Sequence, residues 1–515
     1  MAVISSPPSS LASFARACDP PPWDGRVNIV RRTDEVEVEV GPCGGRAVFA
    51  RRFAGTWHVS ETLAPLVALA PCRLDARWLA SLCLLEEWVD STSTPYREVV
   101  RIRPGGRTRL SNTDATPRFL ASGVPPVCPD VDLEALLRAH LARYARGPLG
   151  VLTGGIDSSF LLALGAPKGV ACVSIDLGGS DADRPYVEML CRHLGLTPTF
   201  VLPSDCAALL PADMTVDATP LAWPSSPLEI GAMKSARALG CVAAVSGGGG
   251  DDLFEREQSS AGAIFASGAW SAAVRIASAG TEGTVLSRLR QNLLWPLLRR
   301  QVPWPLRRLK RVLRDGRGHY PKFFRPLARE QHDEVLARRS RQRTVEECSP
   351  EERLAWAFDL PFSGSTAFHR HLSEVAAGIP RFDPYFEPDI LAGVMSAPLI
   401  AHFEGHLPRG LLRRPARRRL PPAVWERTSK AGFEAATAAL FRAHRVALDG
   451  LADVGALADL GVIDPRLFGE RYARFALDPA GDPVGWGNVW PTLAVEAFVR
   501  GFGGLPRRFT GSMCG

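Results

Sequence analysis

The stretch that most constrains the fold runs from an apolar strand through two glycines into a helix. Its sequence is Val151-Leu-Thr-Gly-Gly-Ile-Asp-Ser-Ser159. Such a turn directs backbone N–H groups and a helix N-terminus at one place, and that arrangement attracts phosphate. Asp157 follows the glycines, and a carboxylate there can hold the magnesium ion that accompanies a nucleotide. The stretch therefore predicts a nucleotide-phosphate site at the end of a strand.

A second stretch has the same plan. The apolar run 241–245 leads into Ser246-Gly-Gly-Gly-Gly-Asp-Asp-Leu-Phe254. In a parallel sheet, the loops at the carboxyl ends of the strands lie along one edge, where ligands bind. We therefore expect the two glycine loops to meet at one site, with Asp157 and Asp251 sharing the metal.

Strands and helices alternate around the two loops, with a helix before them that is capped by Asp130 or Asp132. The predicted strands are 149–152, 170–175, 199–202 and 241–245, and the predicted helices are 158–164, 184–194 and 228–239. This alternation is typical of an α/β fold with a doubly wound parallel sheet. From about residue 255 onward the pattern is mainly helical and interrupted by prolines.

The N-terminal part has a different character. Residues 36–40 alternate valine with glutamate, as a half-exposed strand does, and 46–53 and 98–102 are further predicted strands, with one helix at 79–88. We interpret 26–125 as a small α+β domain that precedes a larger domain over 129–515. Residues 1–25, rich in serine and proline, are interpreted as a disordered extension.

Composition narrows the class of protein. Apolar residues make up 46% of the chain. No run of about 18 apolar residues occurs, so no membrane-spanning helix is predicted. The eleven cysteines include no CxxC pair, which argues against a zinc site and favours reduced thiols in a cytoplasmic protein. The net charge is +7, with arginine-rich segments at 288–317 and 409–419. Each segment is either a solvated surface or a surface for an acidic peptide, a partner protein or nucleic acid.

Four stretches resemble one family. The first loop resembles the SGGxDS loop of the ATP-pyrophosphatase group, with Thr153 in place of the first serine. The second resembles the SGxGxDE segment of asparagine synthetases, with Asp252 in place of glutamate. Residues 381–391 resemble their RVPFLD region, with an insertion, and 409–433 resemble their K-x-x-L-R … LP … R-x-K-x-G-F ending. The combination points to the asparagine-synthetase-like branch.

This resemblance implies an ATP-dependent amide-forming enzyme that adenylates a carboxylate, with ATP and Mg²⁺ as cofactors. It implies that Asp157 and Asp251 hold the metal and act in catalysis, and that Lys430 takes the place of the active-site lysine. The residues expected to bind the nucleotide are Thr153, Gly154, Gly155, Asp157, Ser158, Ser159, Ile175, Ser246, Gly247 and Gly248.

The N-terminal domain resembles a class II glutamine amidotransferase domain, most clearly at 95–106. Glutamine-hydrolysing asparagine synthetases carry a cysteine at position 2, where this chain has Ala2. The resemblance therefore implies a degenerate domain without ammonia chemistry, and an amine already present on the substrate as nucleophile. Two branches fit, β-lactam synthetase and the lasso peptide macrolactam synthetase, or lasso cyclase. We favour the lasso cyclase, which joins an Asp or Glu side chain of a precursor peptide to the peptide's N-terminal amine.

Other functions stay open. They are an asparagine synthetase that uses free ammonia, a non-enzymatic scaffold, and an RNA-modifying enzyme of the wider ATP-pyrophosphatase group. The expected partners are the precursor peptide, a leader-peptide-binding protein and a leader protease; neither nucleic acid nor a membrane is expected. The peptide, the ring size and the general base are not identified. Related ring-closing enzymes use a Tyr–Glu pair, for which the resemblance offers Glu374 or Glu387, with Tyr385 close by in the sequence.

Overall fold

The strand that leads into the first glycine loop lies at the centre of a five-stranded parallel sheet. In the computed structural model the strand order is β11–β10–β9–β14–β15. The strands are β9 (Leu149–Leu152), β10 (Ala171–Ile175), β11 (Pro198–Val201), β14 (Ala243–Ser246) and β15 (Arg381–Phe382). The predicted parallel sheet is confirmed, and β15 is a fifth strand that the sequence did not predict.

The structure describes only part of the chain. The described residues are 2–3, 27–31, 35–40, 47–83, 92–103, 106–122, 131–178, 183–206, 214–280, 283–302, 306, 323–325, 348–349, 351–353, 361–428 and 432–502. Lys430, most of the extension 1–25 and much of the arginine-rich segment 288–317 lie outside these ranges.

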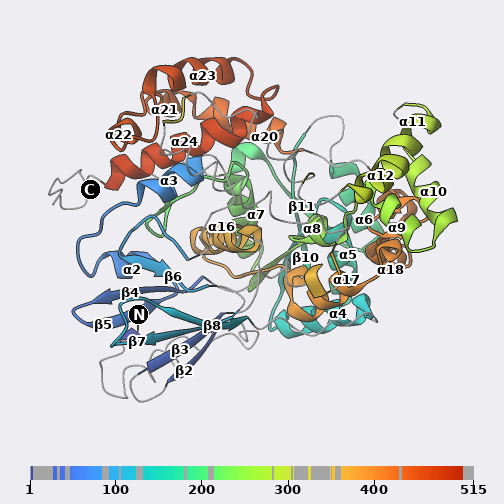
Figure 1. Cartoon of the computed structure of the whole chain (residues 1–515), viewed down its shortest axis with the longest axis horizontal. Helices are drawn as coiled ribbons and strands as arrows, with labels where there is room; N and C mark the ends of the chain where they lie inside the picture. The colour runs from blue at the N-terminus through green and yellow to red at the C-terminus, as the bar shows by residue number, and fades with distance from the viewer. Residues whose placement is uncertain are drawn as a thin grey trace.

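Helices cover both faces of the sheet (Figure 1). Val151 and Val245 pack on one face with α4 (Leu133–Tyr144), α5 (Ile156–Gly165) and α6 (Arg184–Leu194). Val173 and Ala244 pack on the other face with α7 (Ser226–Ala238) and α16 (Pro361–Ala377). Because neighbouring residues of a strand point to opposite faces, each short strand contributes to two cores. The sheet is therefore doubly wound.

Several helix ends follow the sequence signals. Asp132 caps α4 by accepting a hydrogen bond from Ala135 N at 3.0 Å. The helix α6 ends at Gly195, whose φ of +69° lies in the left-handed region that glycine adopts without a Cβ penalty. The helix α5 begins at Ile156, two residues before the predicted start, because the chain turns into the helix directly after Gly155. Asp157 therefore lies in the first turn, where the helix dipole stabilises a carboxylate.

The N-terminal part forms two four-stranded antiparallel sheets, ordered β1–β5–β4–β6 and β2–β3–β7–β8. The strands are β1 (Ala2–Val3), β2 (Val27–Arg31), β3 (Glu35–Val40), β4 (Phe49–Phe53), β5 (Thr56–Ser60), β6 (Val99–Arg101), β7 (Gly106–Ser111) and β8 (Arg118–Ser122). The prediction of a half-exposed strand at 36–40 is wrong for Glu37, which is buried and pairs with Arg109 at 3.4 Å.

The rest of the described chain is mainly helical. Its principal helices are α3 (Ala76–Cys83), α8 (Gly250–Phe254), α9 (Ala261–Ala266), α10 (Trp270–Ser278), α11 (Val285–Leu289), α12 (Trp295–Gln301), α17 (Pro388–Ser396), α18 (Gly410–Ala416), α19 (Pro422–Trp425), α20 (Glu434–Ala443), α21 (Arg445–Asp449), α22 (Gly455–Asp459), α23 (Pro465–Leu477) and α24 (Pro483–Phe502). The helices α20–α24 gather beside α3 and α7, and α9–α12 form a separate group (Figure 1). Across the described residues, no helix has the length and apolar character needed to cross a membrane.

Candidate functional site

The two glycine loops touch each other. A Cβ atom on Gly250 would overlap the carboxyl group of Asp157, and one on Gly247 would lie 2.8 Å from the backbone nitrogen of Ser158. Only glycine fits at such close approaches. The loops follow β9 and β14, which are neighbours in the sheet. The structure thus brings the two loops to one place, as the sequence predicts.

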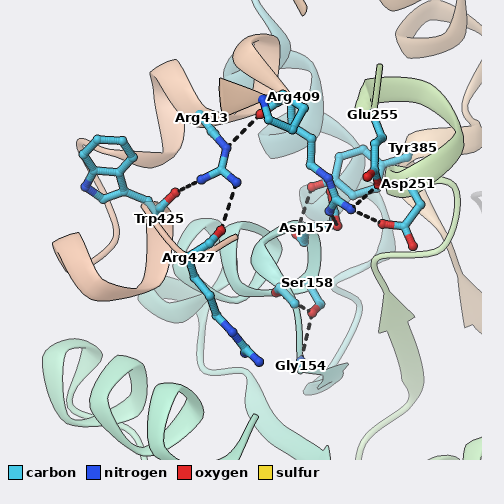
Figure 2. Close-up of polar contacts among 12 residues, drawn as sticks. Gly154, Asp157, Ser158, Asp251, Glu255, Tyr385, Arg409, Arg413, Trp425 and Arg427 are labelled. Carbon is cyan, nitrogen blue, oxygen red and sulfur yellow. Dashed lines mark hydrogen bonds and ion pairs between the residues drawn. The ribbon is translucent and has the colours of Figure 1, made fainter. Parts of the chain in front are cut away.

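The first loop is held by its own hydrogen bonds. Gly154 N donates to Ser158 Oγ at 3.0 Å, and that hydroxyl donates to Gly155 O at 3.1 Å (Figure 2). Thr153 Oγ1 donates to Val151 O at 3.1 Å. These bonds shape a turn at the N-terminus of α5, which is the geometry that anion sites use. The side chains of Thr153, Asp157, Ser158 and Ser159 are all buried, and their assignment as phosphate ligands stays a prediction.

Arg409 lies between the two loops, and its role was not predicted from the sequence. Its guanidinium pairs with Asp157 Oδ2 and with Asp251 Oδ1, each at 2.5 Å (Figure 2). A third carboxylate, Glu255, contacts the same guanidinium at 2.7 Å. Asp157 and Asp251 therefore face a common point, and in this structure that point holds an arginine.

The backbone of Arg409 has an uncommon conformation. Its φ of +66° lies in the left-handed region, which costs a residue with a side chain on the order of 1–2 kcal/mol. Arg409 is the N-cap of α18, and the next residue, Gly410, lies so close to Phe403 that a Cβ there would overlap the Phe403 backbone. Strained conformations of this kind concentrate at functional sites. Here the strain accompanies a side chain aimed at three carboxylates.

Charge and burial act on the pKa values of this cluster. Burial opposes the charge on Arg409, but Asp157, Asp251 and Glu255 outweigh it and raise the pKa of the guanidinium. Burial raises the pKa of Tyr385 well above its usual value, and the charge of Asp157 adds to the effect. Tyr385 Oη donates to the backbone oxygen of Asp157 at 2.9 Å. Tyr385 is therefore a neutral hydrogen-bond donor that supports the first loop.

Arg413 holds the segment that leads to Lys430. It is buried and donates to three backbone oxygens: those of Pro408 at 2.8 Å, Arg427 at 2.9 Å and Trp425 (Figure 2). These carbonyls come from both ends of the 408–427 segment, so one side chain closes the segment into a loop. Lys430 itself lies outside the described residues, and its role stays a prediction.

Arg427 links the same segment back to the first glycine loop. Its guanidinium pairs with Asp183 at 2.6 Å and lies 4.0 Å from the ring centroid of Tyr186. Asp183 is next to the loop, because a Cβ on Gly154 would lie 2.8 Å from Asp183 Oδ2. The segment before Lys430 and the first loop are thus joined through one buried ion pair.

A buried charge cluster supports the second loop. Gly248 N donates to Ser246 Oγ at 3.1 Å, and Ser246 Oγ donates to Asp383 Oδ1. Asp383 also pairs with Arg370 and, at 3.3 Å, with Arg381. Burial opposes the charge on Asp383, yet the two arginines lower its pKa below the usual value. The Ser246 hydroxyl, expected to bind nucleotide, is directed at this cluster.

Ile175 is half-buried at the carboxyl end of β10, on the same edge of the sheet as the two loops. The next residue, Asp176, pairs with Arg184 at 2.8 Å, and its backbone nitrogen donates to Val201 O at 2.9 Å. These bonds fix the end of the strand. The structure therefore places Ile175 where a ligand of the loops could contact it, and its role stays a prediction.

The donor set at the two loops suits Mg²⁺. This ion takes carboxylate oxygens and is usually held by one or two carboxylates together with substrate phosphates. Asp157 and Asp251 provide two carboxylates that already converge on one cation. No group of three or more His, Cys, Asp or Glu side chains in the described ranges is arranged as a complete metal centre. The site fits a metal whose remaining ligands are phosphate and water.

The arginine-rich segment 409–419 is paired within the chain. Besides Arg409 and Arg413, Arg414 and Arg417 pair with Glu404, and Arg418 and Arg419 pair with Glu134. Each of its arginines thus has a partner inside the molecule. Arg409 and Arg413 therefore belong to the site, whereas the Arg417 and Arg418 side chains stay 57% and 70% exposed. The interpretation of the segment as a docking surface stays a prediction.

The two acids considered as general bases have structural partners. Glu374 accepts a hydrogen bond from Arg381 N at 3.2 Å, and Glu387 accepts one from Tyr144 Oη. Both bonds join helices to the segment around β15. A role of either acid as general base stays a prediction.

Comparison with known proteins identifies the family. The sequence model described as asparagine synthase matches residues 133–499, a span that includes both glycine loops, Asp183, Arg409 and Arg427. A search of the curated proteins finds no match to the chain. Members of the matched family are ATP-dependent amide-forming ligases that generally require Mg²⁺. With two touching glycine loops, convergent aspartates and a match over most of its length, this chain belongs to the asparagine synthase family.

Proposed function

We propose that the protein is a lasso peptide cyclase. It would use ATP to adenylate an Asp or Glu side chain of a precursor peptide and close a macrolactam with the N-terminal amine of that peptide. The observation that carries the proposal is the convergence of Asp157 and Asp251 on one point beside the N-terminus of α5. In a family of ATP-dependent amide-forming ligases, this arrangement supports binding of a metal-bound triphosphate.

The proposed reaction has two steps. A carboxylate oxygen attacks the α-phosphorus of ATP, the bond to the β-phosphate breaks, and pyrophosphate leaves with the electron pair. The amine nitrogen then attacks the carbonyl carbon of the mixed anhydride, AMP leaves, and the nitrogen loses a proton. When bound, magnesium would neutralise phosphate charge as a Lewis acid. Asp157 and Asp251 would hold it.

The chain's own groups favour the first step. The positive end of the α5 dipole, at the N-terminus of the helix, would stabilise negative charge on the leaving pyrophosphate. Tyr385 and Ser158 keep the first loop in shape through bonds to Asp157 O and to Gly154 and Gly155. Lys430, at the end of the segment held by Arg413 and Arg427, would place an ammonium near the α-phosphate.

The proposal that the substrate is a peptide rests on the amino-acid sequence. Residue 2, where glutamine-hydrolysing asparagine synthetases carry a cysteine, is an alanine that pairs with Val59 as part of β1. This supports a substrate amine as the nucleophile in place of ammonia from glutamine. The proposal includes the precursor peptide, a leader-peptide-binding protein and a leader protease as partners in a cytoplasmic pathway. A β-lactam synthetase or an ammonia-dependent asparagine synthetase is the alternative.

The test is an assay of the purified full chain with Mg-ATP. Three mixtures are compared: a synthetic precursor peptide encoded beside the gene, aspartate with ammonium, and no second substrate. The proposal expects AMP and a peptide product lighter by one water only in the first mixture. AMP formation with aspartate and ammonium alone would favour asparagine synthetase. Absence of AMP from all three mixtures, with the leader-binding partner and protease added, would overturn the proposal.

A further inference from the structure

Arg409 occupies the position that the proposed function gives to magnesium. We propose that Arg409 is an internal counter-ion that excludes the metal until the phosphates of a nucleotide arrive, so that metal and nucleotide enter the site together. The inference rests on the proposed ATP-dependent function and adds a role for this residue that the family match does not carry.

The contacts place the two cations in competition for the same carboxylates. The Arg409 guanidinium uses different nitrogens for Asp157 Oδ2 and Asp251 Oδ1, both at 2.5 Å. Magnesium needs carboxylate oxygens at about 2.0–2.1 Å in a near-octahedral arrangement. A metal that took these two oxygens would have to displace both charge-assisted hydrogen bonds of the arginine.

Charge explains why the nucleotide drives this exchange. Free Mg²⁺ approaches a site whose carboxylates are already partly neutralised and where a guanidinium repels it. A nucleoside triphosphate with its bound metal carries a net negative charge, which attracts the guanidinium of Arg409. In the exchange, the carboxylates pass from arginine to the metal and the arginine gains phosphate oxygens as partners, a geometry that arginine suits well. Asp157, Asp251 and Arg409 each keep an opposite partner in this exchange.

The structure allows the side chain to move while its backbone stays. Arg409 O accepts hydrogen bonds from Leu412 N at 3.0 Å and Arg413 N at 2.8 Å, which fix the start of α18. The Arg409 side chain is 11% exposed, but its partners Asp251 and Glu255 are 45% and 52% exposed. The cluster therefore opens to solvent on the side of these two acids, where a nucleotide can reach the guanidinium.

The test measures how tightly the full chain binds Mn²⁺, which replaces Mg²⁺ in the assay. The electron paramagnetic resonance signal of the free ion reports how much Mn²⁺ is unbound. Titrations are made without nucleotide and with the non-hydrolysable analogue α,β-methylene-ATP. The unaltered protein is expected to bind Mn²⁺ weakly alone and at least tenfold more tightly with the analogue. Arg409→Ala is expected to bind Mn²⁺ alone at least tenfold more tightly than the unaltered protein, and to bind the analogue at least tenfold more weakly.

Three further variants locate the effect. Arg417→Ala is the matched control, because Arg417 is an exposed arginine at the C-terminal end of α18 that pairs with Glu404; it should behave as the unaltered protein. Arg409→Lys keeps the positive charge, so its binding of Mn²⁺ without nucleotide should stay weak. Adding Asp251→Asn to Arg409→Ala should abolish the gained Mn²⁺ binding. Thermal unfolding of each variant checks that the fold is kept.

The outcomes separate this inference from the proposed function. If the unaltered protein binds the analogue with Mn²⁺, but Arg409→Ala gains no affinity for Mn²⁺ alone, the counter-ion role is wrong and the function stands. If the unaltered protein binds Mn²⁺ alone as tightly as it does with the analogue, the counter-ion role is also wrong. If no protein binds the analogue under any condition, the ATP-dependent function itself fails.

Discussion

Arg427 and Asp183 form a buried ion pair, with 2.6 Å between Nη1 and Oδ1, that joins two separate parts of the site. Asp183 lies against Gly154 in the first glycine loop, and Arg427 lies three residues before Lys430. Arg413 holds the backbone oxygen of Arg427 from the other side. The chain that leads toward Lys430 is therefore fixed relative to the first glycine loop as far as Arg427.

Breaking this pair should destabilise the protein and impair catalysis. Asp183→Ala leaves the Arg427 guanidinium without its buried carboxylate, and removing one member of such a pair costs about 3 kcal/mol. Urea unfolding followed by circular dichroism measures the loss. The control is Arg466→Ala, which removes an exposed pair with Glu470 and should change stability by less than about 0.5 kcal/mol. Equal effects of the two changes would contradict the structural role of Asp183.

The two convergent aspartates should both be needed for the adenylation step. Asp157→Asn and Asp251→Asn each replace a metal-binding carboxylate with a neutral amide of the same shape. Each should lower the rate of AMP release on the order of 10²–10³-fold, the cost typical of removing one electrostatic contact to the transition state. The measurement is peptide-dependent AMP release at saturating Mg-ATP. Asp252→Asn serves as the comparison, and an effect as large as that of Asp251→Asn would argue against the assignment.

Gly250→Ala and Gly469→Ala should change stability in opposite directions. A Cβ on Gly250 would overlap the Asp157 carboxyl group, so the two loops must separate. Overpacking of this kind costs about 1–3 kcal/mol. Gly469 lies inside α23, where a Cβ would point into open space, and alanine there should stabilise the helix by about 0.5–1 kcal/mol. Thermal and urea unfolding of both variants test the contrast, which disappears if the loops do not touch.

The buried Asp383 should make the free energy of unfolding depend on pH. Burial opposes its charge, but Arg370 and Arg381 lower the pKa of Asp383 below the value of about 3.8 of a free aspartate. A carboxyl group with a depressed pKa contributes stability that is complete above its unfolded-state pKa and is lost as pH falls through its folded-state pKa. Unfolding by urea should therefore show Asp383→Asn to be much less stable than the unaltered protein at pH 7.

The difference in unfolding free energy between these two proteins should shrink as the pH falls below about 4, because Asp383 of the unfolded chain then takes up a proton that the folded protein does not. The control is Asp478→Asn, a change at an exposed residue directly after α23, which should alter the unfolding free energy by less than about 0.5 kcal/mol. A difference that stays constant from pH 7 to pH 3 would show that the charge of Asp383 does not stabilise the cluster.

Much of the fold and part of the site follow from the sequence alone. The strand β9 and the helix α6 have the predicted bounds, and Gly195 adopts the left-handed conformation expected of a helix end. These features depend on patterns within a few residues, such as apolar periodicity, a cap or a glycine. The meeting of the two glycine loops was also predictable, because neighbouring parallel strands present their carboxyl ends at one edge.

The tertiary structure decided which charges meet. Arg409 is 252 positions from Asp157 and 158 from Asp251, and no local pattern relates them. The two-residue strand β15 and the burial of Glu37 likewise depend on what packs against them. Local propensity determines where a strand ends and a helix begins. Charged residues far apart in the sequence form an ion pair only where the fold brings them together. The sequence alone therefore predicted a phosphate-type site at two meeting glycine loops, and only the fold placed an arginine where the metal was expected.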